Sequence, residues 1–366
     1  MMYIWQYQDW PNFTYSLTEL PPISVKFAQE MGEINGIVSV LDDNLKIETL
    51  LEILIAEAIK TSEIEGEYMS REDVMSSIKR NLGLKDNTIV RDKRVAGIAE
   101  LMTFVRQSYN KDLTVQMILD WHSSLMNAFP KVSAGKWREG TEPMQVISGA
   151  YGKEIVHYEA PPSSDVSIQM NMFVSWFQEQ AIPAKDHVTK ALVKSAITHL
   201  YFESIHPFED GNGRIGRALA EYALSNTLQI PLLLSISKVI EKNKQQYYDA
   251  LKRAQSSLEI TDWIIYFTQV ILDAQIEAKH IVEFAVNKAK FFDRFKDKLN
   301  EREFKAINRM LESGVDGFKG GMTAKKYIAI TKTSKATATR DLQHLNELGV
   351  FRTTGLGRSV RYELIF

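Results

Sequence analysis

The sequence predicts a mainly helical protein of more than one domain, with one β-hairpin near its middle. Apolar residues recur at helical spacing over about 45–66 and again over 187–205. Residues 144–160 alternate apolar and polar side chains around glycines, a pattern typical of a hairpin. The last part of the chain, 300–366, indicates three more helices followed by two short alternating segments.

Composition bounds the class of protein. The 366 residues suggest two or three domains, and 45% hydrophobic with 25% charged residues is typical of a soluble globular protein. A formal net charge of −2 argues against a protein that coats nucleic acid. Without cysteine there is no disulfide, thiolate metal site or catalytic thiol, which leaves the redox compartment open. Because residues 1–11 do not resemble a signal peptide and no apolar segment reaches membrane-spanning length, we expect a cytoplasmic protein without a membrane partner.

The N-terminal region, 1–110, is expected to be helical, and its most apolar helix covers about 45–66. Gly66 suits the position that ends this helix. Three carboxylates lie at that end, where the helix dipole disfavours negative charge. They are Glu63, Glu65 and Glu67. A cation elsewhere in the fold is therefore expected to hold them, although a solvated acidic helix end is the plainer interpretation.

The central region, 111–270, contains the most informative stretch of the chain, residues 206–217. It follows the helix over 187–205, which Pro207 ends because the residue before a proline avoids the helical conformation. It reads His-Pro-Phe-Glu-Asp-Gly-Asn-Gly-Arg-Ile-Gly-Arg, and a second helical pattern begins behind its glycines. Those glycines match the dinucleotide fingerprint G-x-G-x-x-G, but that fingerprint follows a strand, whereas a helix is predicted here.

The chemistry of this stretch favours a phosphate site. Gly211 and Gly213 allow backbone N–H groups to approach an anion at a helix N-terminus. Arg214 and Arg217 are three residues apart, so both can bind phosphate oxygens from one face of that helix. A hard oxygen ligand for Mg²⁺ and a side chain that takes a proton near neutral pH complete the set. These two are Asp210 and His206. Alone, each has a plainer structural role in a turn, a helix end or a solvated face; together they favour phosphate binding.

These twelve residues resemble the signature of the Fic family, H-P-F-x-D/E-G-N-G-R-x-x-R, at every fixed position. The resemblance implies a Fic-type helical bundle with a β-hairpin flap that pairs with a target protein. It also implies a protein adenylyltransferase, a nucleotidyltransferase that moves AMP from ATP to a Ser, Thr or Tyr hydroxyl of the target or of itself. In the family scheme His206 is the base and Asp210 holds Mg²⁺ or Mn²⁺. The phosphates are bound there by Gly211, Asn212, Gly213, Arg214 and Arg217.

Two other segments extend the resemblance. Residues 61–66 are similar to the family's inhibitory motif, S/T-x-x-x-E-G/N, which implies that Glu65 pairs with Arg217 and blocks the productive position of the γ-phosphate. The reverse activity, removal of AMP from the target, is compatible with the same glutamate. Tyr247 and Tyr248 lie where an aromatic pair borders the adenine and ribose in the family, although helical spacing indicates that one of them is a core residue.

The C-terminal part resembles a winged helix-turn-helix domain. A charge-rich helix over 271–299 is expected to connect it to the core, and 300–366 contains its three helices and hairpin. Between Lys319 and Arg361 there are nine basic and two acidic residues, as expected of a DNA-binding surface. Such domains also bind proteins or dimerise, so DNA, a protein partner and a homodimer are all compatible with the sequence. The rival to the enzyme is a nucleotide-sensing, DNA-binding transcription regulator.

Overall fold

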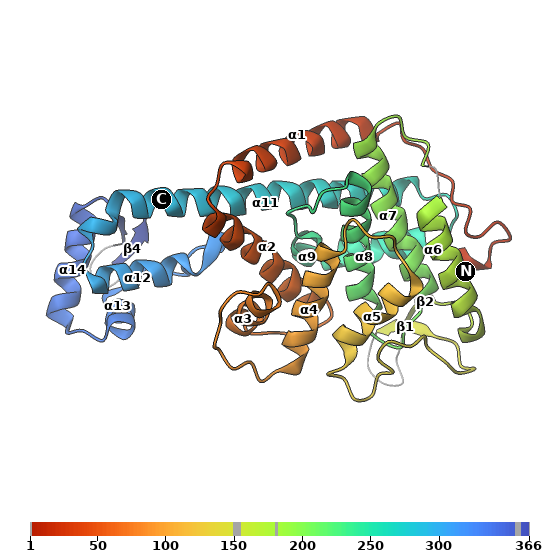
Figure 1. The fold of residues 1–366 in the computed structure, drawn as a ribbon, viewed down its shortest axis with the longest axis horizontal. Helices are drawn as coiled ribbons and strands as arrows, with labels where there is room; N and C mark the ends of the chain where they lie inside the picture. Colours follow the sequence, from red (N-terminus) through yellow and green to blue (C-terminus); the bar gives the residue numbers. More distant parts are fainter. Residues whose placement is uncertain (1, 149–154, 180–181, 356–359, 366) are drawn as a thin grey trace. The chain divides into compact units, whose positions relative to one another are not determined.

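The computed structural model describes residues 2–148, 155–179, 182–355 and 360–365 (Figure 1). Its elements confirm the mainly helical class. The chain divides into two compact units, one of residues 1–33 and 53–278, the other of residues 34–52 and 279–366. The divisions fall inside three helices, α1 (Leu20–Ser39), α2 (Asp43–Ile64) and α11 (Thr261–Phe295). Within the described ranges, no helix is both long and apolar enough to cross a membrane.

Two consecutive helices form the centre of the first unit. α7 (His187–Ile205) and α8 (Asn212–Leu228) pack side by side, and every residue from Ser195 to Ile205 is buried. Burial on all sides explains why the apolar pattern of α7 is only approximately helical in period. The neighbours of this pair are α4 (Lys93–Gln107), α5 (Val115–Met126) and α6 (Val166–Glu179).

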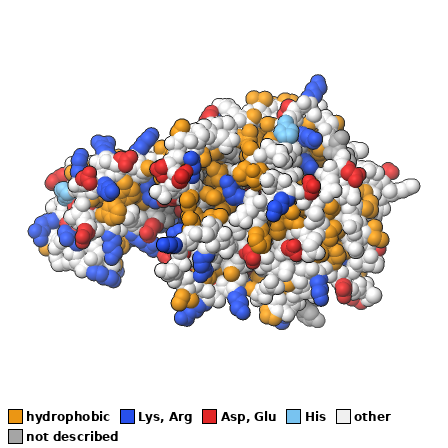
Figure 2. Space-filling model, viewed as in Figure 1, with side chains coloured by type: hydrophobic (Ala, Val, Ile, Leu, Met, Phe, Trp, Pro, Cys, Tyr) orange, Lys and Arg blue, Asp and Glu red, His pale blue; other side chains and the backbone are white. Residues whose placement is uncertain are grey.

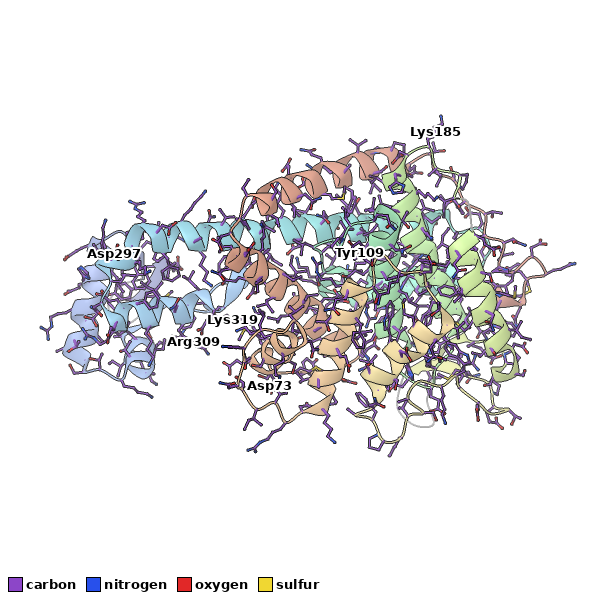
Figure 3. The ribbon with its side chains drawn as sticks, viewed as in Figure 1. Asp73, Tyr109, Lys185, Asp297, Arg309 and Lys319 are labelled. Carbon is purple, nitrogen blue, oxygen red and sulfur yellow. The ribbon has the colours of Figure 1, made fainter. Side chains whose placement is uncertain are left out.

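Shorter elements complete the first unit. They are two 3-10 turns, Ile4–Gln6 and Ser163–Asp165, and the helices α3 (Arg71–Asn81), α9 (Ile236–Lys242) and α10 (Lys244–Ala254). Several helices begin after a side chain suited to the N-cap, since Ser70, Thr114 and Asp186 each accept a backbone N–H of the first turn. Lys185, just before the cap of α7, is exposed and points away from the ribbon (Figure 3).

The predicted hairpin in the middle of the chain is confirmed. β1 (Gln145–Ser148) and β2 (Ile155–Glu159) pair antiparallel, with a bulge between Val146 and Ile147. The Tyr158 hydroxyl donates to the carbonyl of Ser204, 2.6 Å away, and so ties β2 to the end of α7. The glycine-containing tip predicted at 149–154 lies outside the described residues.

The three helices and the hairpin predicted for the C-terminal part are present. They are α12 (Glu301–Leu311), α13 (Ala324–Thr331), α14 (Lys335–Glu347), β3 (Phe351–Thr354) and β4 (Arg361–Leu364). The preceding helix, α11, ends at Phe295 rather than at Leu299, because residues 296–298 form a 3-10 turn. The hairpin tip, 356–359, which includes Arg358, lies outside the described residues.

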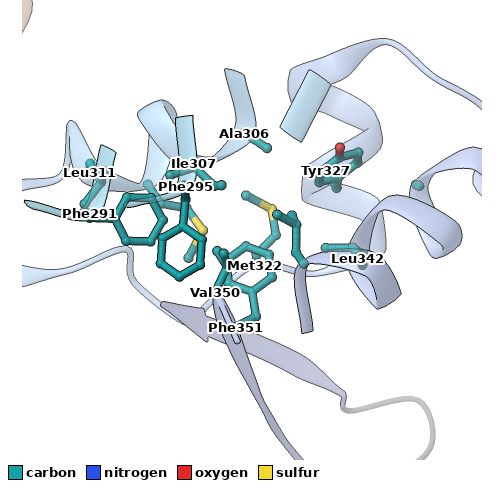
Figure 4. Close-up of a cluster of buried hydrophobic side chains, with 13 residues drawn as sticks. Phe291, Phe295, Ala306, Ile307, Leu311, Met322, Tyr327, Leu342, Val350 and Phe351 are labelled. Carbon is teal, nitrogen blue, oxygen red and sulfur yellow. The ribbon is translucent and has the colours of Figure 1, made fainter. Parts of the chain in front are cut away.

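An apolar cluster joins the elements of this second unit (Figure 4). It includes Phe295, Ile307, Tyr327, Leu342 and Phe351. The Tyr327 hydroxyl donates to the buried carboxylate of Asp341, 2.9 Å away, which also accepts from Arg302. On the face shown in Figure 2, basic and acidic side chains are interspersed over this unit.

Candidate active site

The loop between α7 and α8 carries the predicted motif in an unusual backbone conformation. His206 ends α7 with φ 50° and ψ 60°, in the left-handed region that residues with a side chain rarely adopt. Gly211, with φ 82°, is the N-cap of α8, and a Cβ there would lie 3.1 Å from the sulfur of Met126. Left-handed residues other than glycine persist only where surrounding contacts hold them, and they cluster at functional sites.

Asn212 closes this loop with its side chain. Its Oδ1 accepts the N–H of Phe208 at 3.0 Å, and its Nδ2 donates to the carbonyl of the same residue at 2.8 Å. The side chain is therefore engaged within the loop. The groups of this segment that can face an anion are the backbone N–H groups at the start of α8.

Arg138, which no sequence pattern singled out, holds the loop from a distant segment. Its Nε donates to the carbonyl of His206 at 2.7 Å, its Nη2 to the carbonyl of Pro161 at 2.6 Å, and its Nη1 to Oγ of Ser163 at 2.8 Å. Burial lowers the pKa of this guanidinium to about 10. Because two of these three acceptors are backbone carbonyls, no motif of residue types marks the arginine in the sequence.

His122 supports the other side of the loop. Its ring stacks on Phe208 with centroids 3.6 Å apart, and its Nδ1 accepts the N–H of Gly135 at 2.9 Å. The ring proton is therefore on Nε2, which donates to the carbonyl of Asp210 at 3.1 Å. Burial lowers the pKa of His122 to about 4, so the ring is neutral at pH 7. It lies on the apolar helix α5, and no motif distinguishes it there from a core histidine.

A cavity of about 570 Å³ lies beside the motif. Predicted site residues that border it are Glu65, His206, Gly213, Arg217, Tyr247 and Tyr248. Strands β1 and β2 and helix α10 supply much of the remaining wall. Predicted residues outside its lining are Asp210, Gly211, Asn212 and Arg214. The fold thus brings the candidate base, one arginine and both tyrosines to one cavity.

The two tyrosines differ in their surroundings. Tyr247 is buried, and its hydroxyl lies 2.8 Å from Nε2 of His199 inside the bundle, where burial raises its pKa. Tyr248 is 42% exposed. Tyr248 is therefore the tyrosine whose ring is accessible to a ligand, and Tyr247 is largely a core residue.

Glu65 lies in the place where the motif would receive an anion. Its Oε1 accepts from Nη2 of Arg217 at 2.8 Å, and a Cβ built on Gly213 would lie only 2.4 Å from the same oxygen. Arg217 also donates to the side chain and the carbonyl of Thr61, at 2.9 and 3.0 Å. Burial lowers the pKa of Arg217, but Glu65, Tyr247 and Glu203 together outweigh burial, and the pKa of the guanidinium is raised. An internal carboxylate therefore sits against the N-terminus of α8.

A second carboxylate of the same segment holds the other arginine. Oε1 of Glu67 lies 3.0 Å from Nη1 of Arg214, whose side chain is 1% exposed. The sequence placed Glu67 at an unfavourable helix end but did not indicate its partner. The two glutamates are two residues apart and the two arginines three, so one short segment pairs with both arginines of the motif.

Besides the two arginines that pair with Glu65 and Glu67, two lysines lie at the end of α2. Nζ of Lys244 lies 3.2 Å from the carbonyl of Ile64, in the last turn of the helix, and Lys60 pairs with Glu63 at 2.6 Å. A positive group at a helix C-terminus satisfies free carbonyls and offsets the dipole. The segment that carries Glu65 and Glu67 is thus held by lysines at the end of α2 and by the two arginines of the motif.

Asp210 lies on the solvent side of the motif, with 55% of its side chain exposed. Its Oδ1 accepts the N–H of Gly211 at 2.5 Å and lies 3.5 Å from Arg214. Within the part of the chain that the structure describes, no three His, Asp or Glu side chains cluster closely enough to hold a metal ion. A single accessible carboxylate does fit Mg²⁺, which is commonly held by one or two carboxylates together with substrate phosphates.

His206 borders the cavity as a neutral imidazole. Burial, together with the nearby Arg138, lowers its pKa to about 4, so one ring nitrogen carries no proton at pH 7. Its Nδ1 lies 3.8 Å from Oε2 of Glu203. Burial raises the pKa of Glu203 to about 8.

Two family models match separate segments of the chain. Residues 112–224 match the model of the Fic/DOC family, and residues 3–84 match a domain of unknown function, DUF4172. A protein adenylyltransferase Fic from Aedes aegypti is 24% identical over 225 residues, which cover 60% of this chain and 41% of that protein. The chain therefore spans less than half the length of this relative.

Solved structures share the fold. A Fic family protein from Desulfovibrio desulfuricans G20 aligns over 98% of both chains with a TM-score of 0.54 and 23% identity. A Fic domain containing signaling protein from Bacteroides thetaiotaomicron VPI-5482 aligns over 72% of this chain and 97% of its own, with a TM-score of 0.53 and 15% identity. At these identities the likeness shows a common fold.

Proposed function

We propose that this protein transfers AMP from ATP to a Ser, Thr or Tyr hydroxyl of a target protein. The observation that carries the proposal is the carboxylate of Glu65 against Gly213 and Arg217. This site accepts an internal anion at a helix N-terminus, so it has groups that can bind a phosphate. The neutral histidine beside it can accept the proton of the target hydroxyl. The 24% identical relative that is named an adenylyltransferase supports the same reaction.

The residues suggest a direct displacement. Nε2 of His206 takes the proton of the target hydroxyl, whose oxygen attacks the α-phosphorus of ATP, and the bond to the leaving pyrophosphate breaks. Arg214, Arg217 and the N–H groups at the start of α8 hold the phosphates. Asp210 would hold Mg²⁺ or Mn²⁺, which offsets phosphate charge when bound. Tyr248 offers an aromatic face for the adenine.

Glu65 restrains this reaction in the proposed scheme. Its carboxylate lies where a phosphate of ATP would approach Gly213 and Arg217, so ATP binds productively only after Glu65 moves. The same carboxylate could orient a water molecule for the reverse reaction, removal of AMP.

Mass spectrometry of the full chain after incubation with ATP and Mg²⁺ tests the proposal. We expect Glu65→Gly to add AMP to itself and the native protein to add little. Glu63→Gly is the matched control, because Glu63 pairs with Lys60 and not with the motif, and it should behave like the native protein. Equal incorporation by native and Glu65→Gly proteins would remove the restraint from the scheme. His206→Ala in the Glu65→Gly background should keep ATP binding and lose transfer.

A nucleotide-sensing, DNA-binding regulator is the second candidate. The solvent face of α14 presents Lys335, Thr339, Arg340 and Gln343, all exposed, as a recognition helix would. Absence of transfer from Glu65→Gly, with ATP binding retained, would favour this candidate over the enzyme.

A further inference from the structure

Glu203 is a buried acid in the cavity wall to which the proposed reaction assigns no role. It lies in the last turn of α7, three residues before His206, and is 5% exposed. Its Oε2 is 3.8 Å from Nδ1 of His206. Its Oε1 is buried and has no hydrogen-bond partner among the described residues. A buried carboxyl without full hydrogen bonding is costly, so a purely structural role explains it poorly.

Gly216 makes the space that Glu203 occupies. A Cβ on Gly216 would lie 2.3 Å from Oε1 of Glu203 and 3.3 Å from Cε1 of His199, so any larger residue there would displace one of them. Gly216 stands at a variable position of the twelve-residue signature, so the motif itself does not require a glycine there. The position of Glu203 between α7 and α8 therefore depends on the glycine at 216.

Several charged and titratable groups face this carboxyl. Burial is the largest influence and raises its pKa, nearby Arg217 lowers it, and Glu65 raises it further. His206 lies on its other side, and that ring also faces Arg138. The hydroxyls of Tyr247 and Tyr158 are near enough for Glu203 to raise their own pKa values. The state of Glu203 therefore depends on the ion pair between Glu65 and Arg217.

We propose that Glu203 is a positioning residue for His206, whose ionised carboxylate stabilises the imidazolium that forms during transfer. This inference rests on the proposed function. The hydroxyl proton moves to Nε2, Nδ1 keeps its proton, the new oxygen–phosphorus bond forms as pyrophosphate leaves, and Glu203 stays ionised throughout. A carboxylate behind the base acts in this way in the triads of serine hydrolases.

The proposal links the base to the restraint. When Glu65 leaves Arg217, Glu203 loses a repelling negative charge and faces a guanidinium whose carboxylate partner has left. Both changes favour the ionised carboxyl. Displacement of Glu65 thus opens the phosphate position and, until a phosphate takes its place, favours the ionised carboxylate of Glu203 behind the base.

The test uses the full chain in the Glu65→Gly background, with AMP transfer rates measured from about pH 6 to about pH 9. The rate should rise with pH through one ionisation and level off, because His206 itself titrates below this range. Glu203→Gln keeps the size of the side chain but cannot ionise. We expect its transfer rate to stay flat across this pH range, at about one-tenth of the plateau rate of the parent protein, with KM for ATP unchanged. Gly216→Ala, whose Cβ would displace the carboxyl of Glu203, should lower the rate and remove its rise with pH in the same way. An unchanged profile in Glu203→Gln overturns the proposal.

A measurement that needs no activity separates this inference from the proposed function. The measurement is an NMR pH titration of the Glu65→Gly protein with isotope-labelled histidine, in which the ring signals of His206 are assigned by their loss in His206→Ala. The chemical shifts of these signals should change in one step as Glu203 ionises. Glu203→Gln should abolish that step. If Glu65→Gly transfers no AMP but the step is present, the enzyme proposal fails and the coupling stands. If no step is found, the coupling fails whatever the activity.

Discussion

Arg138 and His122 hold the backbone of the loop that carries His206, although neither borders the cavity. Arg138 fixes the carbonyl of His206 and two groups of the segment after the hairpin, and His122 fixes the carbonyl of Asp210. Each is buried and makes hydrogen bonds that water would otherwise supply. The left-handed backbone of His206 is therefore held by partners that lie far from it in the chain.

Arg138→Met should destabilise the protein and disable the site together. Removal of the guanidinium leaves buried carbonyls unsatisfied, which costs about 1–3 kcal/mol for each such group. We expect a lower free energy of unfolding in urea and loss of AMP transfer in the Glu65→Gly background. Arg106→Met is the matched control, since Arg106 is also largely desolvated but donates to the carbonyl of Leu232, away from the loop. If Arg106→Met loses AMP transfer as fully as Arg138→Met does, the geometry of the loop is not the cause of the loss.

The end of α2 is the element that covers both arginines of the motif. Lys244 holds its last carbonyls, Thr61 contacts Arg217, and Glu65 and Glu67 occupy the two arginines of the motif. In the proposed scheme, this segment leaves before both arginines bind a nucleotide.

Glu67→Gln should release Arg214 in part. The amide keeps the shape of the side chain but lacks the charge that pairs with the guanidinium. We therefore expect a rate of AMP transfer above that of the native protein and below that of Glu65→Gly, measured as initial rates at limiting ATP. The double variant should exceed both single variants. Glu63→Gln serves as the control, and a double variant no faster than Glu65→Gly would leave Glu67 without a part in the restraint.

The molecule as a whole combines the cavity unit with a C-terminal unit that has its own core. The carboxylate of Asp341 joins α12, α13 and α14 through Arg302 and Tyr327, and the apolar cluster of Figure 4 lies beside it. This internal network leaves the outer face of α14 to solvent. The exposed lysine and arginine of that face are the basis for the second candidate function.

Duplex DNA binding by the full chain tests that face. If α14 enters a groove, Arg340→Glu should weaken binding and lower the slope of log K against log salt by about one or more, since a phosphate or base contact is lost. Arg309→Glu is the control, because Arg309 lies on α12 rather than on α14 and already pairs with Glu312, three residues along the chain. Failure of the native chain to bind DNA even at low salt would leave α14 as a surface for a protein partner.

Local patterns in the sequence determined the helical class, the helix–loop–helix around residues 206–217, the hairpin and the C-terminal helices. These follow from apolar periodicity and from capping residues that act over a few positions. The sequence did not predict the end of α11 at Phe295, because nothing in a charge-rich helix marks where an α-helix becomes a 3-10 turn.

Only the tertiary structure decided how the site is assembled. Glu67 pairs with Arg214, Arg138 donates to the carbonyl of His206, and Glu203 packs against Gly216. These contacts join segments that are separated in the sequence, so no residue spacing predicts them. Burial then selected Tyr248 rather than Tyr247 as the accessible ring and set the pKa values of His206 and Glu203. The sequence named the groups that can handle a phosphate, but which of them are charged, covered or free to act depends on the low-dielectric surroundings that only the packed fold provides.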